Sequence, residues 1–135
     1  MRIQRAETPA RLDGLAAAER FFAHCFEAPA DRSAERLWVA HLDDDARCLK
    51  LTQHGGKRDA VGLPVRDILR DAAELGSVGV VLAHNHPSGD PAPSPEDCRA
   101  TRSLALAAEA IDLAVVDHLV FAGPHCRSFR RMGYL

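Results

Sequence analysis

A short apolar run, VGVVLA at Val78–Ala83, limits the fold of this chain more than any other feature. It has the length of a strand and shows no polar alternation, which is typical of a central strand buried on both faces. A helix is expected directly before it. Pro64 fits the first position of that helix, an apolar stripe follows it through Leu75, and Gly76 suits the C-terminal cap. The chain therefore needs a sheet with helices packed on it.

The rest of the pattern supplies further helices and strands. An amphipathic helix is expected from about Leu12 to Glu27, ending near Pro29, and a second helix from about Pro95 to Ala110. Strands are expected in ERLWVAHL, in ARCLKLTQ after a turn at Asp43–Asp45, and in LAVVDHLVFAG, whereas HGGKRDAVGL reads as a loop that passes into a short strand. This mixture predicts an α/β or α+β fold with a central mixed sheet flanked by helices.

Composition narrows the function classes. With 135 residues, the chain fits one domain, and no run approaches the roughly 20 apolar residues of a membrane span. The N-terminus lacks the apolar segment of a secretion signal, so we expect a cytoplasmic protein without a membrane partner. The four cysteines form no C-x-x-C pair, which predicts free thiols. A net charge of −2 does not favour a nucleic-acid partner.

Polar residues gather directly after the central strand. If that strand stays extended, His84 and His86 point to one face about 6.5–7 Å apart. Asp97 falls in the first turn of the next helix, which the intervening loop can fold back beside them. Two imidazoles and one carboxylate leave one position of a tetrahedral zinc ion open for water. The string SPED is also a capping signature with Ser94 as the cap, so the spacing alone leaves metal ligands and purely structural residues both open.

These four residues form the pattern H-x-H-x7-S-x2-D, and in it the chain resembles the JAMM, or MPN-plus, metallopeptidases. The fuller string AHNHPSGDPAPSPED, with LPVRDILRDAAELGSVGVV before it and SFRRMGYL at the end, is similar to the RadC branch of that superfamily. The resemblance implies a cytidine-deaminase-like sandwich. It covers residues 33–135 as one JAB/MPN domain, after an N-terminal helical extension at residues 1–32.

The resemblance also implies a set of site residues. His84, His86 and Asp97 would hold Zn²⁺, Ser94 would offer its hydroxyl to the oxyanion, and the glutamate before the first core strand would act as general base. In ERLWVAHLD that glutamate is Glu35, which without the family pattern reads as a solvated residue at the start of a strand.

Asp117 and His118 form a second polar pair inside an apolar strand. Alternation lets one of them face the core, and either a hydrogen bond to a ligand histidine or a structural buried histidine fits the pattern. We interpret the pair as structural and leave it out of the site.

Three functions follow from these residues. The first is a zinc-dependent hydrolase of peptide or isopeptide bonds, acting on a peptide or protein substrate. The second is a non-catalytic accessory module in DNA repair or mobile-element biology, and the third is a nuclease, which the net charge disfavours. Related domains often pair, so a homodimer is expected.

Overall fold

Five strands form one mixed sheet in the computed structural model, which describes residues 10–27, 33–55 and 62–135. Their order is β2-β1-β3-β4-β5, and β3 and β4 are parallel whereas the other neighbours are antiparallel. The strands are β1 Leu37–Leu42, β2 Cys48–His54, β3 Gly79–Asn85, β4 Ala114–Ala122 and β5 His125–Ser128. Every residue of β3 is buried. The predicted central strand is confirmed, but it begins at Gly79, and Val78 before it is exposed.

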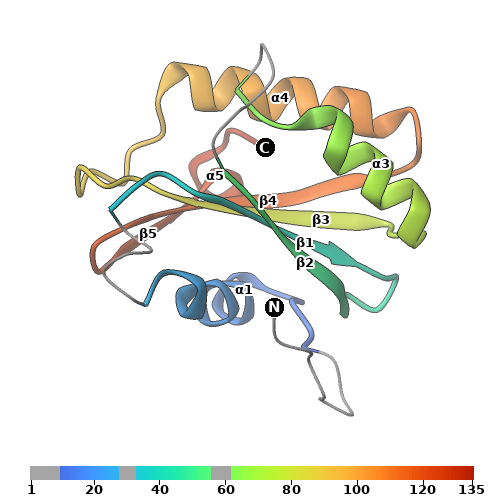
Figure 1. Cartoon of the computed structure of the whole chain (residues 1–135), viewed down its shortest axis with the longest axis horizontal. Helices are drawn as coiled ribbons and strands as arrows, with labels where there is room; N and C mark the ends of the chain where they lie inside the picture. The colour runs from blue at the N-terminus through green and yellow to red at the C-terminus, as the bar shows by residue number, and fades with distance from the viewer. Residues whose placement is uncertain (1–9, 28–32, 56–61) are drawn as a thin grey trace.

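Helices cover both faces of this sheet (Figure 1). On one face lie α3, Val65–Leu75, and α4, Pro95–Glu109; on the other lies α1, Leu15–Ala23, which continues into the 3-10 turn η1, His24–Phe26. Alternate strand residues divide between two apolar clusters, so that Val80 and Leu82 face α3 and α4 while Val81 and Ala83 face α1. The predicted mixed sheet flanked by helices is confirmed.

The N-terminal helix begins later than the sequence pattern predicts. Leu12 is buried, but its N–H donates to the carbonyl of Ala46 at 2.8 Å, and the N–H of Cys48 donates to the carbonyl of Ala10 at 2.8 Å. Residues 10–12 therefore pair with the start of β2 in an extended form. The apolar spacing of Leu12 comes from this bridge and not from a helical turn. Pro29, where the helix was expected to end, lies outside the described residues.

The helix before the central strand differs from the prediction by one residue. Pro64 is its N-cap, with ψ of 68°, and the helix begins at Val65. Gly76 adopts a φ of 69° at the C-terminal end, as the cap prediction requires, because glycine enters the left-handed region without a Cβ clash. The short strand expected in HGGKRDAVGL falls largely on residues 56–61, outside the described residues.

The sequence pattern predicts no separate helix or strand after β4. A hairpin at Gly123 leads into β5, and a short helix, α5 at Phe129–Met132, follows it. Within the part of the chain that the structure describes, no helix combines the length and apolar character needed to cross a membrane.

Three segments meet at one end of the sheet. The start of β1 pairs with the end of β3, with Leu37 opposite His84. The loop after β3 then returns the chain to Ser94, where α4 begins. Residues just before β1, at the end of β3 and at the start of α4 are therefore neighbours.

Candidate metal centre

Two histidines project from the end of β3 toward the face covered by α4. His84 is a strand residue and only 2% exposed. The strand ends at Asn85, yet the N–H of His86 still donates to the carbonyl of Phe121 at 2.8 Å, so the extended pairing reaches one residue further. The two side chains consequently share a face, and their Nε2 atoms lie 3.0 Å apart. The predicted alternation is confirmed.

Asp97 comes to these rings from the first turn of α4. Its N–H donates to Ser94 Oγ at 3.0 Å, and its Oδ2 accepts the N–H of Ser94 at 2.9 Å, which confirms the predicted capping box. The same Oδ2 lies 3.2 Å from Nε2 of His86 and 3.6 Å from Nε2 of His84. One carboxylate oxygen thus caps the helix and also faces both imidazoles.

Glu35 reaches the cluster from the segment that precedes β1. Its Oε2 lies 3.9 Å from Nε2 of His84, and its side chain is 43% exposed. Asn85, buried between the two histidines, holds this segment on either side of Glu35: its Oδ1 accepts the N–H of Arg36 at 2.7 Å and its Nδ2 donates to the carbonyl of Ala34 at 3.1 Å. The sequence interpretation missed Asn85. The available signal was an amide inside a run of buried residues.

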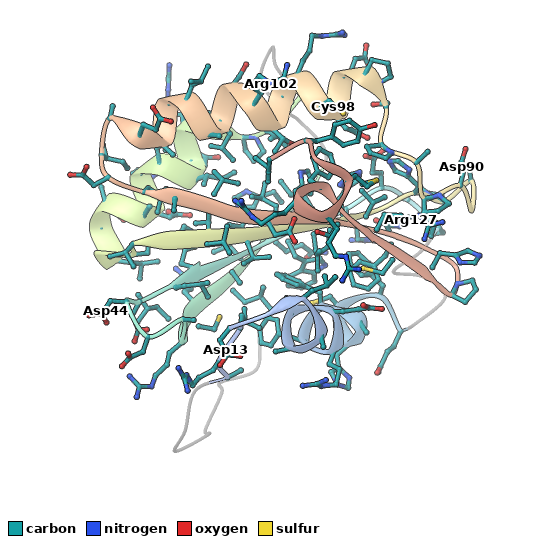
Figure 2. All side chains as sticks on the ribbon, turned by 180° about the vertical axis from the view of Figure 1, so that it is seen from behind. Asp13, Asp44, Asp90, Cys98, Arg102 and Arg127 are labelled. Carbon is teal, nitrogen blue, oxygen red and sulfur yellow. The ribbon has the colours of Figure 1, made fainter. Side chains whose placement is uncertain are left out.

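The His86 ring makes a hydrogen bond with the nitrogen that points away from the cluster, and this bond constrains the state of the nitrogen that points toward it. Nδ1 of His86 lies 2.8 Å from the carbonyl oxygen of Asp90. A carbonyl only accepts, so Nδ1 carries a hydrogen, and in the neutral ring that would bind a metal Nε2 carries a lone pair. That lone pair faces the Asp97 carboxylate, and a cation between the two atoms would relieve their repulsion. Figure 2 shows Asp90 on the loop that projects beyond the sheet at this end of the molecule.

A third histidine lies behind His84. Nε2 of His118 is 2.7 Å from Nδ1 of His84, and Nδ1 of His118 is 2.8 Å from Oγ1 of Thr101 in α4. The ring of His118 also stacks on Phe129, with centroids 4.5 Å apart. Of the two alternatives for His118, the hydrogen bond to a candidate ligand histidine is present in the structure, and the ring is also buried.

The prediction that only one residue of the Asp117–His118 pair faces the protein core needs correction. Both are buried, because the sheet is covered on both faces. The register between β3 and β4 shifts after Val80, so His118 lies on the face of His84 while Asp117 serves β5 and α5. Asp117 accepts hydrogen bonds from Ser128 Oγ at 2.6 Å and from the N–H of Arg130 at 3.0 Å.

A cleft opens beside these side chains. It has a volume of about 580 Å³ and is lined by Ala34, Glu35, Gly62, His86, Ser94, Glu96 and Asp97. Gly62, which belongs to the segment HGGKRDAVGL predicted as a loop, also lines the cleft. All five residues predicted for the site thus meet here: Glu35, His84, His86 and Asp97 have ligand atoms within 4.8 Å of one another, and Ser94 caps the helix that carries Asp97.

The sequence as a whole is similar to a known protein family. A family model described as the RadC-like JAB domain matches residues 15–134. The chain belongs to the RadC-like JAB domain family. It is also similar to UPF0758 proteins: 37% identical to one from Roseiflexus castenholzii over 73% of this chain and 43% of that protein, and 33% identical to one from Vibrio vulnificus over 96% of this chain and 58% of that protein. A UPF0758 protein of Ruegeria pomeroyi is 36% identical over 83% of this chain and 50% of its own length.

This RadC-like JAB domain spans about half the length of the curated relatives it matches. The family match begins at Leu15, the first residue of α1, and Phe22 of this helix is fully buried against the sheet. The division into an extension at residues 1–32 and a domain at residues 33–135 stays a prediction.

The donor set of the RadC-like site fits a divalent metal ion. Partial burial by itself raises the pKa of Asp97, but the imidazole of His84 and the N–H of Ser94 stabilise the carboxylate and hold that pKa well below its usual range. Asp97 is therefore an anion, next to two imidazoles and a second carboxyl group from Glu35. Such mixed nitrogen and oxygen donors suit zinc and several other transition metals.

Thiols play no part in this donor set. The four cysteines are free, as predicted, and none belongs to the cluster. Burial raises the pKa of Cys48 to about 11 and that of Cys126 to about 12, so both remain protonated at neutral pH.

Proposed function

We propose that this RadC-like JAB domain is a zinc-dependent hydrolase of peptide or isopeptide bonds. The observation that carries the proposal is the convergence of His84, His86, Asp97 and Glu35 within 4.8 Å at the wall of an open cleft. Two imidazole nitrogens and one carboxylate oxygen are a donor set found in catalytic zinc sites, which keep a position for water. The cleft gives an extended substrate access to that position.

A bound zinc ion supplies Lewis acidity, which polarises a carbonyl group and lowers the pKa of water toward neutrality. In this assignment His84, His86 and Asp97 hold the ion. Their orientation is already fixed by the protein, since His84 contacts His118, His86 contacts the Asp90 carbonyl and Asp97 closes the capping box.

Glu35 is assigned the proton transfers. Its side chain is partly exposed in the cleft and lies 3.9 Å from the nearest histidine nitrogen, so its carboxylate can contact both a water molecule and a substrate. It would take a proton from the attacking water and pass it to the leaving amine. The backbone clamp by Asn85 keeps this carboxylate next to the cluster although the side chain is exposed.

Ser94 is assigned to the oxyanion. Its Oγ accepts the N–H of Asp97, which leaves the hydroxyl hydrogen available for donation into the cleft that Ser94 lines. A donor placed toward the developing negative charge stabilises the tetrahedral intermediate.

The test compares two glutamates of the same cleft. Glu35→Gln is expected to lower the hydrolysis of a mixed peptide pool by about 100-fold or more, the usual contribution of a general base, while zinc content measured by elemental analysis stays the same. Glu96→Gln is the matched control, because Glu96 lines the cleft but does not belong to the cluster. It is expected to keep the activity.

Other outcomes identify the alternatives. Bound zinc without any hydrolysis that depends on Glu35 would favour the accessory module. Cleavage of DNA that is lost in Glu35→Gln would favour a nuclease. The expected homodimer stays a prediction that sedimentation of the chain would check.

A further inference from the structure

Three buried side chains form a hydrogen-bonded row that ends at the candidate metal centre: Thr101 in α4, His118 in β4 and His84 in β3. We propose that Thr101 and His118 are positioning residues that select the tautomer of His84, so that its Nε2 lone pair faces the cluster. This inference rests on the proposed metal site and concerns residues that do not themselves touch the metal.

The positions of the hydrogens along the row follow from which atoms can donate and which can accept a hydrogen bond. If Nε2 of His84 is to bind a metal, its hydrogen must sit on Nδ1, which then donates to Nε2 of His118 over 2.7 Å. His118 must accept with Nε2, so its own hydrogen sits on Nδ1 and donates to Thr101 Oγ1 over 2.8 Å. The hydroxyl oxygen of Thr101 is thus the last acceptor of the row.

The same contacts permit the reverse order. The Thr101 hydroxyl can donate to Nδ1 of His118, whose Nε2 then donates to Nδ1 of His84. This places a hydrogen on Nε2 of His84, where it opposes a cation. While both rings are neutral, the two orders cannot be mixed, because two donors or two acceptors would then face each other. The hydroxyl of Thr101 is therefore coupled to the state of an atom two side chains away.

Burial makes this coupling strict. Thr101 and His118 are each 1% exposed and His84 is 2% exposed, so bulk water does not replace a missing partner. The stack of His118 on Phe129, with 13° between the ring planes, holds the ring in the plane that serves both contacts.

Helix α4 acts on the site through two residues one turn apart. Asp97 faces the cluster directly, and Thr101, four positions later on the same side of the helix, acts through His118. A substitution at Thr101 can thus alter metal binding while the ligands stay in place.

The matched pair for the test is Thr101→Val and Thr101→Ser. Valine keeps the shape but removes the acceptor, and we expect zinc affinity, measured by competition with a chromophoric chelator, to fall roughly 10- to 100-fold, as when partners of metal-binding histidines are lost. Serine keeps the hydroxyl and is expected to retain wild-type affinity. Thermal unfolding of both metal-free variants checks that the fold is kept.

A second measurement reads the row without any substitution. Long-range ¹H–¹⁵N spectra of the zinc-loaded wild type are expected to show His118 with its hydrogen on Nδ1. His118 with its hydrogen on Nε2, or a Thr101→Val variant that binds zinc as tightly as wild type, overturns the inference and leaves the metal site standing. A wild type that binds no zinc removes the proposed function and this inference together.

Discussion

The two ends of the sheet each bury a histidine, but within the described part of the chain only one of these histidines lies among other potential metal ligands. His41 of β1 is fully buried and pairs with Val80 near the start of β3, whereas His84 lies at the other end of that strand. Nδ1 of His41 lies 3.2 Å from Ser77 Oγ, and its Nε2 has no hydrogen-bond partner among the described residues. His84 uses both ring nitrogens and faces two carboxylates. Burial alone therefore does not mark a functional histidine; the convergence of other ligand atoms does.

The two ends also differ in the charge state of their buried or partly buried groups. Burial lowers the pKa of His41, and the opposing influence of Asp71 does not cancel this, so the ring stays neutral. At the other end Asp97 is kept ionised. Figure 2 shows this separation along the molecule, with Asp44 of the β1–β2 turn at one end and the Asp90 loop at the other. Burial at the His41 end thus disfavours charge on the ring itself, whereas at the His84 end a carboxylate lies directly against the ring.

The largest expected effect comes from making the same histidine-to-glutamine substitution at each end of the sheet and comparing the zinc affinities. His84→Gln is expected to lower zinc affinity by more than the roughly 10- to 100-fold typical of losing a hydrogen-bond partner of a ligand, because a ligand itself is lost. His41→Gln makes the same change at the other end and is expected to leave zinc affinity unaltered. Isothermal titration with zinc measures both, and an equal loss in the two variants would mean that burial, and not coordination, sets the affinity.

The sequence predicted most of the architecture because local chemistry decides it. The apolar run at Val78–Ala83 predicts a covered central strand, and its residues from Gly79 onward are buried in β3; the capping box at Ser94 and Asp97 requires a helix start at that point. Where the prediction was wrong, a contact distant in the sequence decided: Leu12 pairs with the start of β2 and so lies outside the helix.

The candidate site was predicted only as far as spacing reaches. His84, His86 and Asp97 lie within fourteen positions of one another in the sequence, so one strand, one loop and one helix turn suffice to bring them together. His118 is 34 positions from His84, and their contact depends on a parallel pairing with a register shift after Val80. No periodicity in the sequence encodes that shift. Glu35 was assigned from the family pattern, because an exposed glutamate before a strand carries no signal of its own.

An intermediate effect concerns the support of Glu35. Asn85→Ala leaves the N–H of Arg36 and the carbonyl of Ala34 without their partner, which loosens the segment that carries Glu35. We expect turnover to fall about tenfold, a smaller loss than that of the base itself, with zinc affinity unchanged. Parallel assays of hydrolysis and zinc binding separate the two.

The control for this variant lies at the opposite end of the sheet. Ser77→Ala removes a buried hydroxyl that contacts His41, and it is expected to lower stability but to keep turnover. If Ser77→Ala reduced turnover as much as Asn85→Ala does, the effect would reflect general loosening of the sheet and not the position of Glu35.

The smallest effect is the pH dependence of stability at the His41 end. Because burial lowers the pKa of His41 in the folded chain, the unfolded chain binds more protons once the pH falls below the ordinary value of 6.5. The contribution of the neutral ring is complete above that pH and is lost progressively as the pH falls from 6.5 toward the lowered pKa. Asp97 also has a lowered pKa, so its contribution is lost in the same direction as the pH falls, but in a separate and more acidic range below its ordinary value of 3.8. Urea unfolding of the metal-free chain between pH 7.5 and 5 is therefore expected to show a decline in the free energy of unfolding, and this decline is expected to be shallower in His41→Gln.

The control is His125→Gln, a substitution at an exposed position in β5, which should keep the wild-type slope of stability against pH. An unchanged slope in His41→Gln would mean that water reaches this ring and that the ring tolerates charge despite its burial.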